Sequence, residues 1–437
     1  QGAEGAIQVN AVVSFAADAS TGGGNITVED TTGDFPLGLV DAGTGTVDLT
    51  SAGSMTDANA GANNIAAATA DLTATGAIGD LAGAGNGDVS LAPTDSLETT
   101  VSTLSVDAVE AAIANTIAGG LTVSSVTPAG VAGSALITNN TDLAVTAHTL
   151  SNDGDSIGYV STTGSVTVPD AAIDVGAGTI RIEAATDGQD VLDATDTDLS
   201  NNLWTADTVV FASGTGESLN LSVDNLTANI TDTTGGGAGD LTVAEANGIS
   251  LTDIDTADGK ITVTATLGNI VVVDVDAAGT NIVALDSTAG NINDAAATTE
   301  VITADSLRLS AETGILALDT AVSNLAAETD TTGNLEVFNT GALDITTVDG
   351  VVGAQIVDAG TNDGGGDIVI TASSPLTITD DVVNNDGGDI TLAADGNAAG
   401  DDMAINANIT ATGGDGNINL FAGDAINLNG TNVVSAA

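Results

Sequence analysis

Residues 366–370 read Gly-Asp-Ile-Val-Ile, and residues 388–392, 22 positions later, read Gly-Asp-Ile-Thr-Leu. The same phrase, a turn pair followed by apolar, polar and apolar residues, recurs at 24–28 (Gly-Asn-Ile-Thr-Val) and at 416–420 (Gly-Asn-Ile-Asn-Leu). Alternation with a period of two after a turn predicts a half-buried β-strand. Because the phrase recurs from end to end, we expect one supersecondary unit stacked repeatedly in one direction.

The spacing of this phrase selects the architecture. The step from Ile26 to Val47 is 21 residues, and the step from Ile368 to Ile390 is 22. About 20 residues hold two or three short strands with their turns, which is one coil of a β-solenoid. We therefore expect an all-β fold, a right-handed parallel β-helix of about 20 coils.

One stretch departs from this pattern, near residues 107–118. Asp107 stands where a helix N-cap would, Glu110 follows three residues later, and Gly119 offers a stop. Apolar residues recur at every fourth position between them. These signals predict one short helix near 107–118, and the alternative is another strand pair with a loop.

The domain organisation follows from the continuity of the repeats. No linker of altered composition interrupts them, so we expect a single continuous β-solenoid over residues 1–437. Residues 1–234 contain long insertions rich in Gly and Ala, which predict less regular coils with longer loops. Residues 235–437 carry the phrase most evenly and are expected to form the most regular coils.

The charge balance excludes several classes of partner. The chain has 3 Lys and Arg residues against 60 Asp and Glu residues, a formal net charge of −57. Nucleic acid is not expected as a partner, because almost no cation is available to neutralise phosphate. Membrane insertion is not expected, because no apolar run is long enough to cross a bilayer.

The sequence has no cysteine, which removes disulfides and thiolate metal sites.

A resemblance to a known family lies in the later repeats. Residues 307–315 read Leu-Arg-Leu-Ser-Ala-Glu-Thr-Gly-Ile, residues 321–327 read Ala-Val-Ser-Asn-Leu-Ala-Ala, and residues 333–337 read Gly-Asn-Leu-Glu-Val. These runs are similar to the coils of filamentous haemagglutinin-like giant bacterial surface proteins. The resemblance implies a secreted right-handed parallel β-helix, extracellular or at the cell surface.

Groups suited to catalysis are few. Acidic pairs occur at 380–381 and 401–402, and the residues that could carry positive charge are His148, Arg181, Lys260 and Arg308. A general acid and a general base must face one bond, yet these residues are many repeats apart in the sequence. We therefore expect a protein that is not an enzyme, without catalytic or cofactor-binding residues, in which His148 faces solvent.

Calcium is the one cofactor that the repeats suggest. In the 22-residue register that stacks Ile368 on Ile390, Asp367 falls on Asp389. Stacked carboxylates repel each other, and a hard cation with oxygen ligands relieves that repulsion. Asp367 and Asp389 are therefore candidate metal ligands, and the alternative is that they are solvated turn residues.

The repeat phrase also reaches close to both ends of the sequence, at 5–9 and at 423–430. An end coil exposes unpaired backbone groups, so another coil is expected to follow. The expected partners are the chain itself, end to end, or further coils of the same giant chain, together with cell-surface glycans.

These features predict an extracellular structural or adhesive solenoid of the bacterial cell surface or matrix, a rigid rod or a head-to-tail filament. The alternative is a polysaccharide-binding or polysaccharide-cleaving β-helix protein. A cleft lined by aromatic side chains discriminates between them, because sugar rings stack on such side chains.

Overall fold

The alternating phrases form short β-strands throughout the computed structural model. The structure describes residues 7–9, 14–81, 88–130, 132–151, 154–194, 199–233, 239–295, 301–331, 333–357, 365–395, 400–414 and 416–436. Within these ranges the only helices are two short 3-10 turns, η1 (Ser20–Gly22) and η2 (Leu199–Asn201). The chain is therefore all-β, as the period of two predicts, and the described residues include no helix that could span a membrane.

The chain divides into two compact units, Gln1–Thr215 and Gly216–Ala437. The strands of the first unit are β1 (Ile7–Val9), β2 (Phe15–Asp18), β3 (Ile26–Asp30), β4 (Phe35–Asp41), β5 (Thr46–Ser51), β6 (Met55–Asp57), β7 (Ile65–Ala74), β8 (Ala77–Ile78), β9 (Leu97–Ala108), β10 (Glu110–Asn115), β11 (Leu121–Pro128), β12 (Ser134–Asn139), β13 (Leu143–Val145), β14 (Ser156–Ser161), β15 (Val166–Val168), β16 (Ile173–Asp174), β17 (Thr179–Ala184), β18 (Val191–Asp193) and β19 (Leu203–Ser213).

The strands of the second unit are β20 (Glu217–Ile230), β21 (Leu241–Glu245), β22 (Ile249–Thr256), β23 (Ile261–Ala265), β24 (Ile270–Val272), β25 (Val275–Ala277), β26 (Ile282–Ser287), β27 (Ile292–Asp294), β28 (Ile302–Thr303), β29 (Ser306–Ala311), β30 (Ile315–Ala321), β31 (Asn324–Thr329), β32 (Leu335–Asn339), β33 (Leu343–Ile345), β34 (Ala354–Ile356), β35 (Ile368–Ala372), β36 (Leu376–Ile378), β37 (Val382–Asn384), β38 (Ile390–Ala394), β39 (Met403–Ile405), β40 (Ile409–Ala411), β41 (Ile418–Ala422), β42 (Ile426–Leu428) and β43 (Val434–Ala436).

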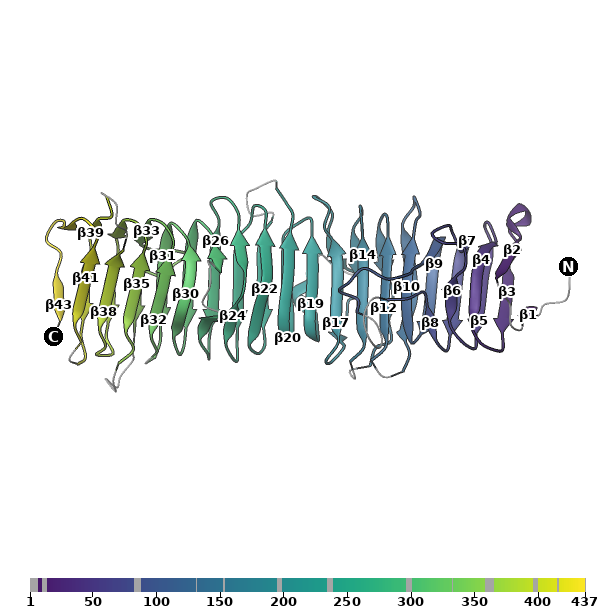
Figure 1. Ribbon diagram of the computed structural model, residues 1–437, viewed down its shortest axis with the longest axis horizontal. Helices are drawn as coiled ribbons and strands as arrows, with labels where there is room; N and C mark the ends of the chain where they lie inside the picture. The colour runs from purple at the N-terminus through teal and green to yellow at the C-terminus, as the bar shows by residue number, and fades with distance from the viewer. Residues whose placement is uncertain are drawn as a thin grey trace. The chain divides into compact units, whose positions relative to one another are not determined.

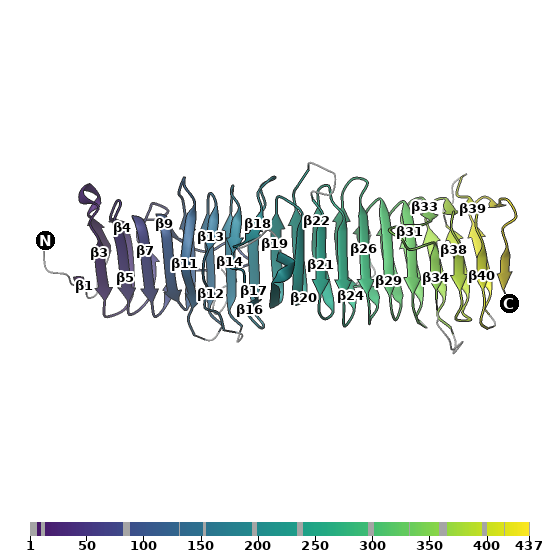
Figure 2. The same ribbon diagram turned by 180° about the vertical axis from the view of Figure 1, so that it is seen from behind.

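Strands of the first unit pair in parallel with strands one repeat away. Ile26 in β3 lies opposite Val47 in β5, which confirms the 21-residue step, and Val47 lies opposite Ala70 in β7. Ile137 in β12 lies opposite Tyr159 in β14. Figure 2 shows β11 beside β13, another parallel pair of this unit. The ladders therefore place equivalent residues of successive repeats side by side.

The second unit is also built from parallel ladders, and from β32 onward it has three strands per repeat. Ile368 in β35 lies opposite Ile390 in β38, as the 22-residue step predicts, and Ile390 lies opposite Ile418 in β41. Figure 1 shows β32, β35, β38 and β41 side by side in the green-to-yellow part of the ribbon. The same order holds for β36, β39 and β42 and for β37, β40 and β43.

Alternate residues of most strands fill the interior. In β35 and β38 the buried positions include Ile368, Ile370, Ile390 and Leu392, each fully buried, while the residues between them reach the surface. Val, Ile and Leu suit this environment, because their branched side chains pack well on a pleated, half-buried surface. Functional side chains are therefore to be sought on the outer faces and in the turns.

The helix expected near residues 107–118 is wrong, and the alternative of a strand pair is confirmed. β9 ends at Ala108 and β10 spans Glu110–Asn115, which pairs residue by residue with β12. The Glu110 carboxylate does not cap a helix but accepts the backbone N–H of Leu81 at 2.7 Å. Asn115, 3% exposed, donates through Nδ2 to Oδ1 of Asn139 at 2.9 Å. Residues outside this segment thus provide the hydrogen-bond partners of Glu110 and Asn115, although the sequence pattern around these two residues favours a helix.

Candidate functional site

Asp367 and Asp389, the candidate calcium ligands, lie in consecutive turns just before β35 and β38. Oδ1 of Asp367 accepts the backbone N–H of Asp389 at 2.8 Å. Oδ1 of Asp389 in turn accepts the backbone N–H of Asn417 at 2.7 Å, and Oδ1 of Asn334 accepts that of Asp367 at 3.0 Å. Each side chain therefore bonds the equivalent turn of the next layer.

This contact recurs in both units, and we name the arrangement the turn ladder. In each case Oδ1 of a turn residue accepts the backbone N–H of the equivalent turn one repeat later. The acceptor and donor residues are Asn25 and Thr46, Asp34 and Ser54, Asp142 and Ser165, Asp240 and Lys260, Asn269 and Asn291, Asp381 and Asn408, and Asp402 and Ala425. An unpaired backbone donor is costly when it is removed from water. An Asp or Asn that follows glycine is the sequence signal at Asn25, Asp34, Asp240 and Asn269, whereas Asp142, Asp381 and Asp402 follow Thr or Asp.

The turn ladder bears on the calcium prediction. At least one oxygen of Asp367 and one of Asp389 is engaged by a backbone N–H. Among the described residues, no group of three or more His, Asp or Glu side chains is arranged to hold a metal ion. Calcium at Asp367 and Asp389 stays a prediction.

Carboxylates also gather on the outer face of the second unit. Asp255 in β22 lies directly opposite Asp276 in β25. Burial raises the pKa of Asp255, and the nearby charges of Asp253, Asp276 and Asp274 raise it further. A pocket of about 270 Å³ adjoins this pair and is lined by Asn229, Thr231, Asp255, Thr256, Ala257, Asp276 and Ala278. Its chemistry suits a ligand with hydroxyl groups or a positive charge.

The acidic pairs considered for catalysis are engaged in structural contacts. Oδ1 of Asp381 and Oδ1 of Asp402 belong to the turn ladder. Oδ2 of Asp380 accepts the hydroxyl of Thr347 at 2.7 Å, and Asp401 is 6% exposed.

His148 is only partly exposed, although the sequence favours a solvent-facing position. Its ring stacks on that of Tyr159, with centroids 6.5 Å apart, and burial lowers its pKa. Nδ1 of His148 and Oη of Tyr159 are both buried and have no hydrogen-bond partner among the described residues. An isolated parallel bridge pairs His148 with Val126 of β11. The sequence pattern did not predict this pairing.

All three basic side chains of the chain are paired with carboxylates. Arg181 forms a two-pronged contact with Glu183, from Nε at 2.9 Å and from Nη2 at 3.0 Å. Lys260 Nζ lies 2.7 Å from Asp349, and Arg308 Nη2 lies 3.2 Å from Asp286. The Lys and Arg side chains that could attract an acidic substrate are thus committed within the protein.

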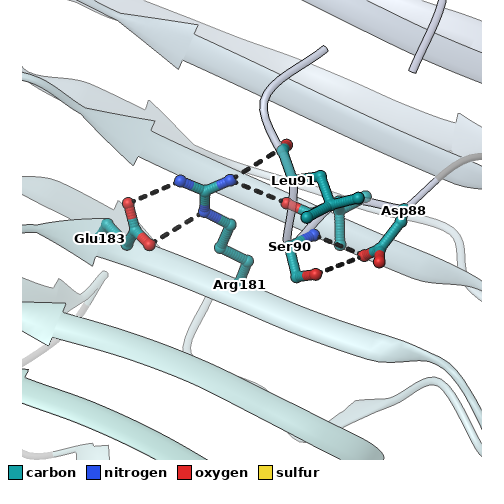
Figure 3. Close-up of polar contacts among 6 residues, drawn as sticks. Asp88, Ser90, Leu91, Arg181 and Glu183 are labelled. Carbon is teal, nitrogen blue, oxygen red and sulfur yellow. Dashed lines mark hydrogen bonds and ion pairs between the residues drawn. The ribbon is translucent and has the colours of Figure 1, made fainter. Parts of the chain in front are cut away.

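Two of these basic residues also fasten loops to the outer face of their own unit. Arg181 Nη1 donates to the carbonyl oxygens of Val89 at 3.0 Å and Leu91 at 3.3 Å (Figure 3). We name residues 88–91 the strap. Val89 of the strap packs in a buried cluster with Leu136 of β12 and Val160 of β14.

The second such loop lies in the other unit. Val348 and Val351 pack against Ala326 of β31, and Lys260 holds the intervening Asp349. These long-range contacts were not foreseen, because a lone Arg or Lys gives no sequence signal of its partner.

The aromatic side chains divide between the interior and the surface, where Phe338 and Phe421 are 38% and 58% exposed. Trp204 and Tyr159 are 1% and 0% exposed. Trp204 packs against Phe211, with ring centroids 6.2 Å apart.

No family model, no curated protein and no solved structure matches the chain.

Proposed function

We propose that this chain is a right-handed parallel β-solenoid that serves as an extracellular structural or adhesive element of a bacterial cell surface or matrix. The observation that carries the proposal is the uninterrupted register of β32, β35, β38 and β41 together with its turn ladder. Such stacking is the property of a quasi-one-dimensional protein, in which each repeat contacts only its neighbours.

The surface chemistry supports an element that stays solvated and repels acidic polymers. With a formal net charge of −57, the chain keeps away from nucleic acid and from anionic membranes. Its resemblance to filamentous haemagglutinin-like coils supports an extracellular location, with glycans of the cell surface as candidate ligands. Hydroxyl-bearing ligands suit the pocket beside Asp255 and Asp276.

The second candidate function is binding or cleavage of a polysaccharide. The pocket beside Asp255 and Asp276 favours it, because two carboxylates lie there in register. Two observations count against it. No aromatic side chain lines this pocket to stack on a sugar ring, and the Lys and Arg side chains are paired internally.

A direct experiment separates the two functions. The purified chain is incubated with neutral and acidic polysaccharides, and the release of reducing ends is measured beside glycan binding. The structural proposal predicts no release with any polymer. Release that disappears in the Asp255→Asn, Asp276→Asn variant overturns it in favour of the enzyme.

A further inference from the structure

Four strands of the first unit carry short polar side chains on their outer surface. β5, β7, β9 and β11 pair in parallel in this order, and Figure 2 shows them in succession. Their outward residues are separated by buried ones. We name the following outward residues the hydroxyl face: Thr46, Asp48 and Thr50 of β5, Thr69, Asp71 and Thr73 of β7, Thr103, Ser105 and Asp107 of β9, and Thr122, Ser125 and Thr127 of β11.

The strand register arranges the hydroxyl face in three columns. The columns read Thr46, Thr69, Thr103 and Thr122; Asp48, Asp71, Ser105 and Ser125; and Thr50, Thr73, Asp107 and Thr127. A bulge at Ser124 in β11 leaves Ser125 and Thr127 in register with β9. Neighbours within a column are about 4.8 Å apart, and outward neighbours along a regular strand are about 6.6 Å apart. The face is therefore a two-dimensional lattice of oxygen-bearing side chains.

The hydroxyl groups of this face make no hydrogen bond with any residue that the structure describes. Threonines in the turns differ, because Oγ1 of Thr75 donates to the carbonyl oxygen of Ala52 at 2.6 Å and Oγ1 of Thr146 to that of Val123 at 3.0 Å. A hydroxyl has one donor and two acceptor sites. On the hydroxyl face, these sites are directed to whatever lies against the strands.

The composition of the face narrows the kind of ligand. It contains only Thr, Ser and Asp, so it offers no aromatic ring on which a sugar could stack and no cation for a phosphate. Carboxylates, the ligands that hard cations prefer, are the minority. A small dissolved molecule would contact few of the hydroxyls, whereas an extended solid with a matching repeat contacts many of them at once.

We propose that the hydroxyl face binds ice. Water oxygens on the faces of hexagonal ice repeat at distances similar to both spacings of the lattice, and ice both donates to and accepts from hydroxyl groups. The buried residues behind the face, such as Val47, Leu72 and Leu104, hold the strands in place, so little order is lost on contact. The inference rests on the proposed adhesive role, for which it names one solid surface.

Ice-affinity purification and thermal hysteresis test the proposal. The wild-type chain is expected to enter the ice fraction during slow freezing and to hold the freezing point of a solution below its melting point. The Thr69→Tyr, Thr103→Tyr variant is expected to lose most of both effects, because two large rings stand above the face. Ser105→Tyr, in the central column, is a second blocking variant. Tyr suits an outward strand position, so the strands are expected to persist.

A matched control lies in the second unit. Thr242 of β21 and Thr262 of β23 also lie directly opposite each other, but Ala284 ends their row and they are not part of the hydroxyl face. The Thr242→Tyr, Thr262→Tyr variant is expected to keep both effects in full. Circular dichroism checks that each variant keeps its strands.

The outcomes are separable from those for the proposed function. A wild-type chain that growing ice excludes and that shows no thermal hysteresis overturns the proposal. A folded blocking variant that keeps both effects, or an equal loss in the control variant, overturns it too. Adsorption to crystalline cellulose or calcium carbonate in place of ice assigns the face to another solid and rejects ice. None of these results involves the release of reducing ends, which alone overturns the structural role.

Discussion

Oδ1 of Asp367 accepts the backbone N–H of Asp389 at 2.8 Å, one repeat further along the chain. The two residues occupy the same place in consecutive Gly-Asp phrases, and the strands that follow them pair in register from Ile368 and Ile390 onward. The acidic turn residue thus links one layer to the next, and its charge keeps the same turn solvated.

Replacing Asp367 tests this role. Asp367→Asn keeps an oxygen acceptor and is expected to leave the free energy of unfolding almost unchanged. Asp367→Ala removes the acceptor for the Asp389 N–H and is expected to lower it by about 1 kcal/mol. Urea denaturation of the three proteins measures the difference. Equal losses in the Asn and Ala variants would show that the hydrogen bond is not what matters.

The same variants test the calcium prediction. If calcium binds between Asp367 and Asp389, the wild-type melting temperature rises with added calcium, because the metal binds the folded chain only. In that case Asp367→Asn, which has one fewer charge, loses most of the rise. A wild-type melting temperature that calcium and a chelator leave unchanged in moderate salt rejects this metal site.

Asp255 and Asp276 face each other across a parallel ladder, and like charges so placed destabilise a sheet. Because burial and neighbouring carboxylates raise the pKa of Asp255, its ionisation weakens the fold as pH rises through that pKa. We expect Asp255→Asn to raise the free energy of unfolding by a few tenths of a kcal/mol at neutral pH and low salt. The gain should shrink in high salt or acid, and a gain independent of both contradicts the charge argument.

Much of the fold could be predicted from the sequence, because one local rule repeats. The phrase at 24–28 predicts β3 and its 21-residue step to β5, and the phrase at 366–370 predicts β35 and its step to β38. Near Glu110 the rule fails, because capping signals are local while the partners of β10 come from β12 and from Leu81.

The candidate site was less predictable than the fold. The register brings Asp367 and Asp389 together as expected, but their backbone partners become visible only when the turn geometry is known. The strap contact of Arg181 joins residues about 90 positions apart, and no periodicity connects them. His148 was misplaced because nothing in its sequence neighbourhood indicates the ring of Tyr159.

Glu245 gives a prediction for the pH dependence of stability. Its side chain is 1% exposed, and burial raises its pKa above the usual 4.5, although backbone N–H groups of Asn247 and Val223 lower it in part. The unfolded chain then loses this proton at lower pH than the folded chain, so stability falls as pH rises from about 4.5 through the folded pKa.

Glu245→Gln removes this titration and keeps one acceptor oxygen. The difference in free energy of unfolding between the variant and the wild type should therefore shift in favour of the variant between acidic and neutral pH. Paired denaturant titrations at several pH values measure it. A difference that stays constant with pH contradicts the assignment.

Arg181 holds the strap through Val89 and Leu91 while it pairs with Glu183. Arg181→Met is expected to cost about 2 kcal/mol, because charge-assisted hydrogen bonds of a mostly buried side chain are lost. Amide hydrogen exchange in residues 88–91 should accelerate.

Arg308→Met is the matched control for the strap, because Arg308 pairs with Asp286 at 3.2 Å. Its loss is expected to cost about 1 kcal/mol, less than that of Arg181, because Arg308 donates one hydrogen bond to a carboxylate whereas Arg181 donates four. Exchange in residues 88–91 that is unchanged by Arg181→Met, or equally accelerated by Arg308→Met, would show that Arg181 does not hold the strap.

The central claim is that successive Gly-Asx phrases stack in parallel and in register, and paired spin labels test it most directly. The chain contains no cysteine, so labels attach only where cysteines are introduced. Val369, Thr391 and Asn419 are successive outward positions of one ladder. Labels at 369 and 391, or at 391 and 419, sit on backbones about 4.8 Å apart, and labels at 369 and 419 on backbones about twice as far apart. We expect strong dipolar broadening in both adjacent pairs and clearly weaker broadening in the outer pair, whereas adjacent pairs without broadening would contradict parallel stacking in register.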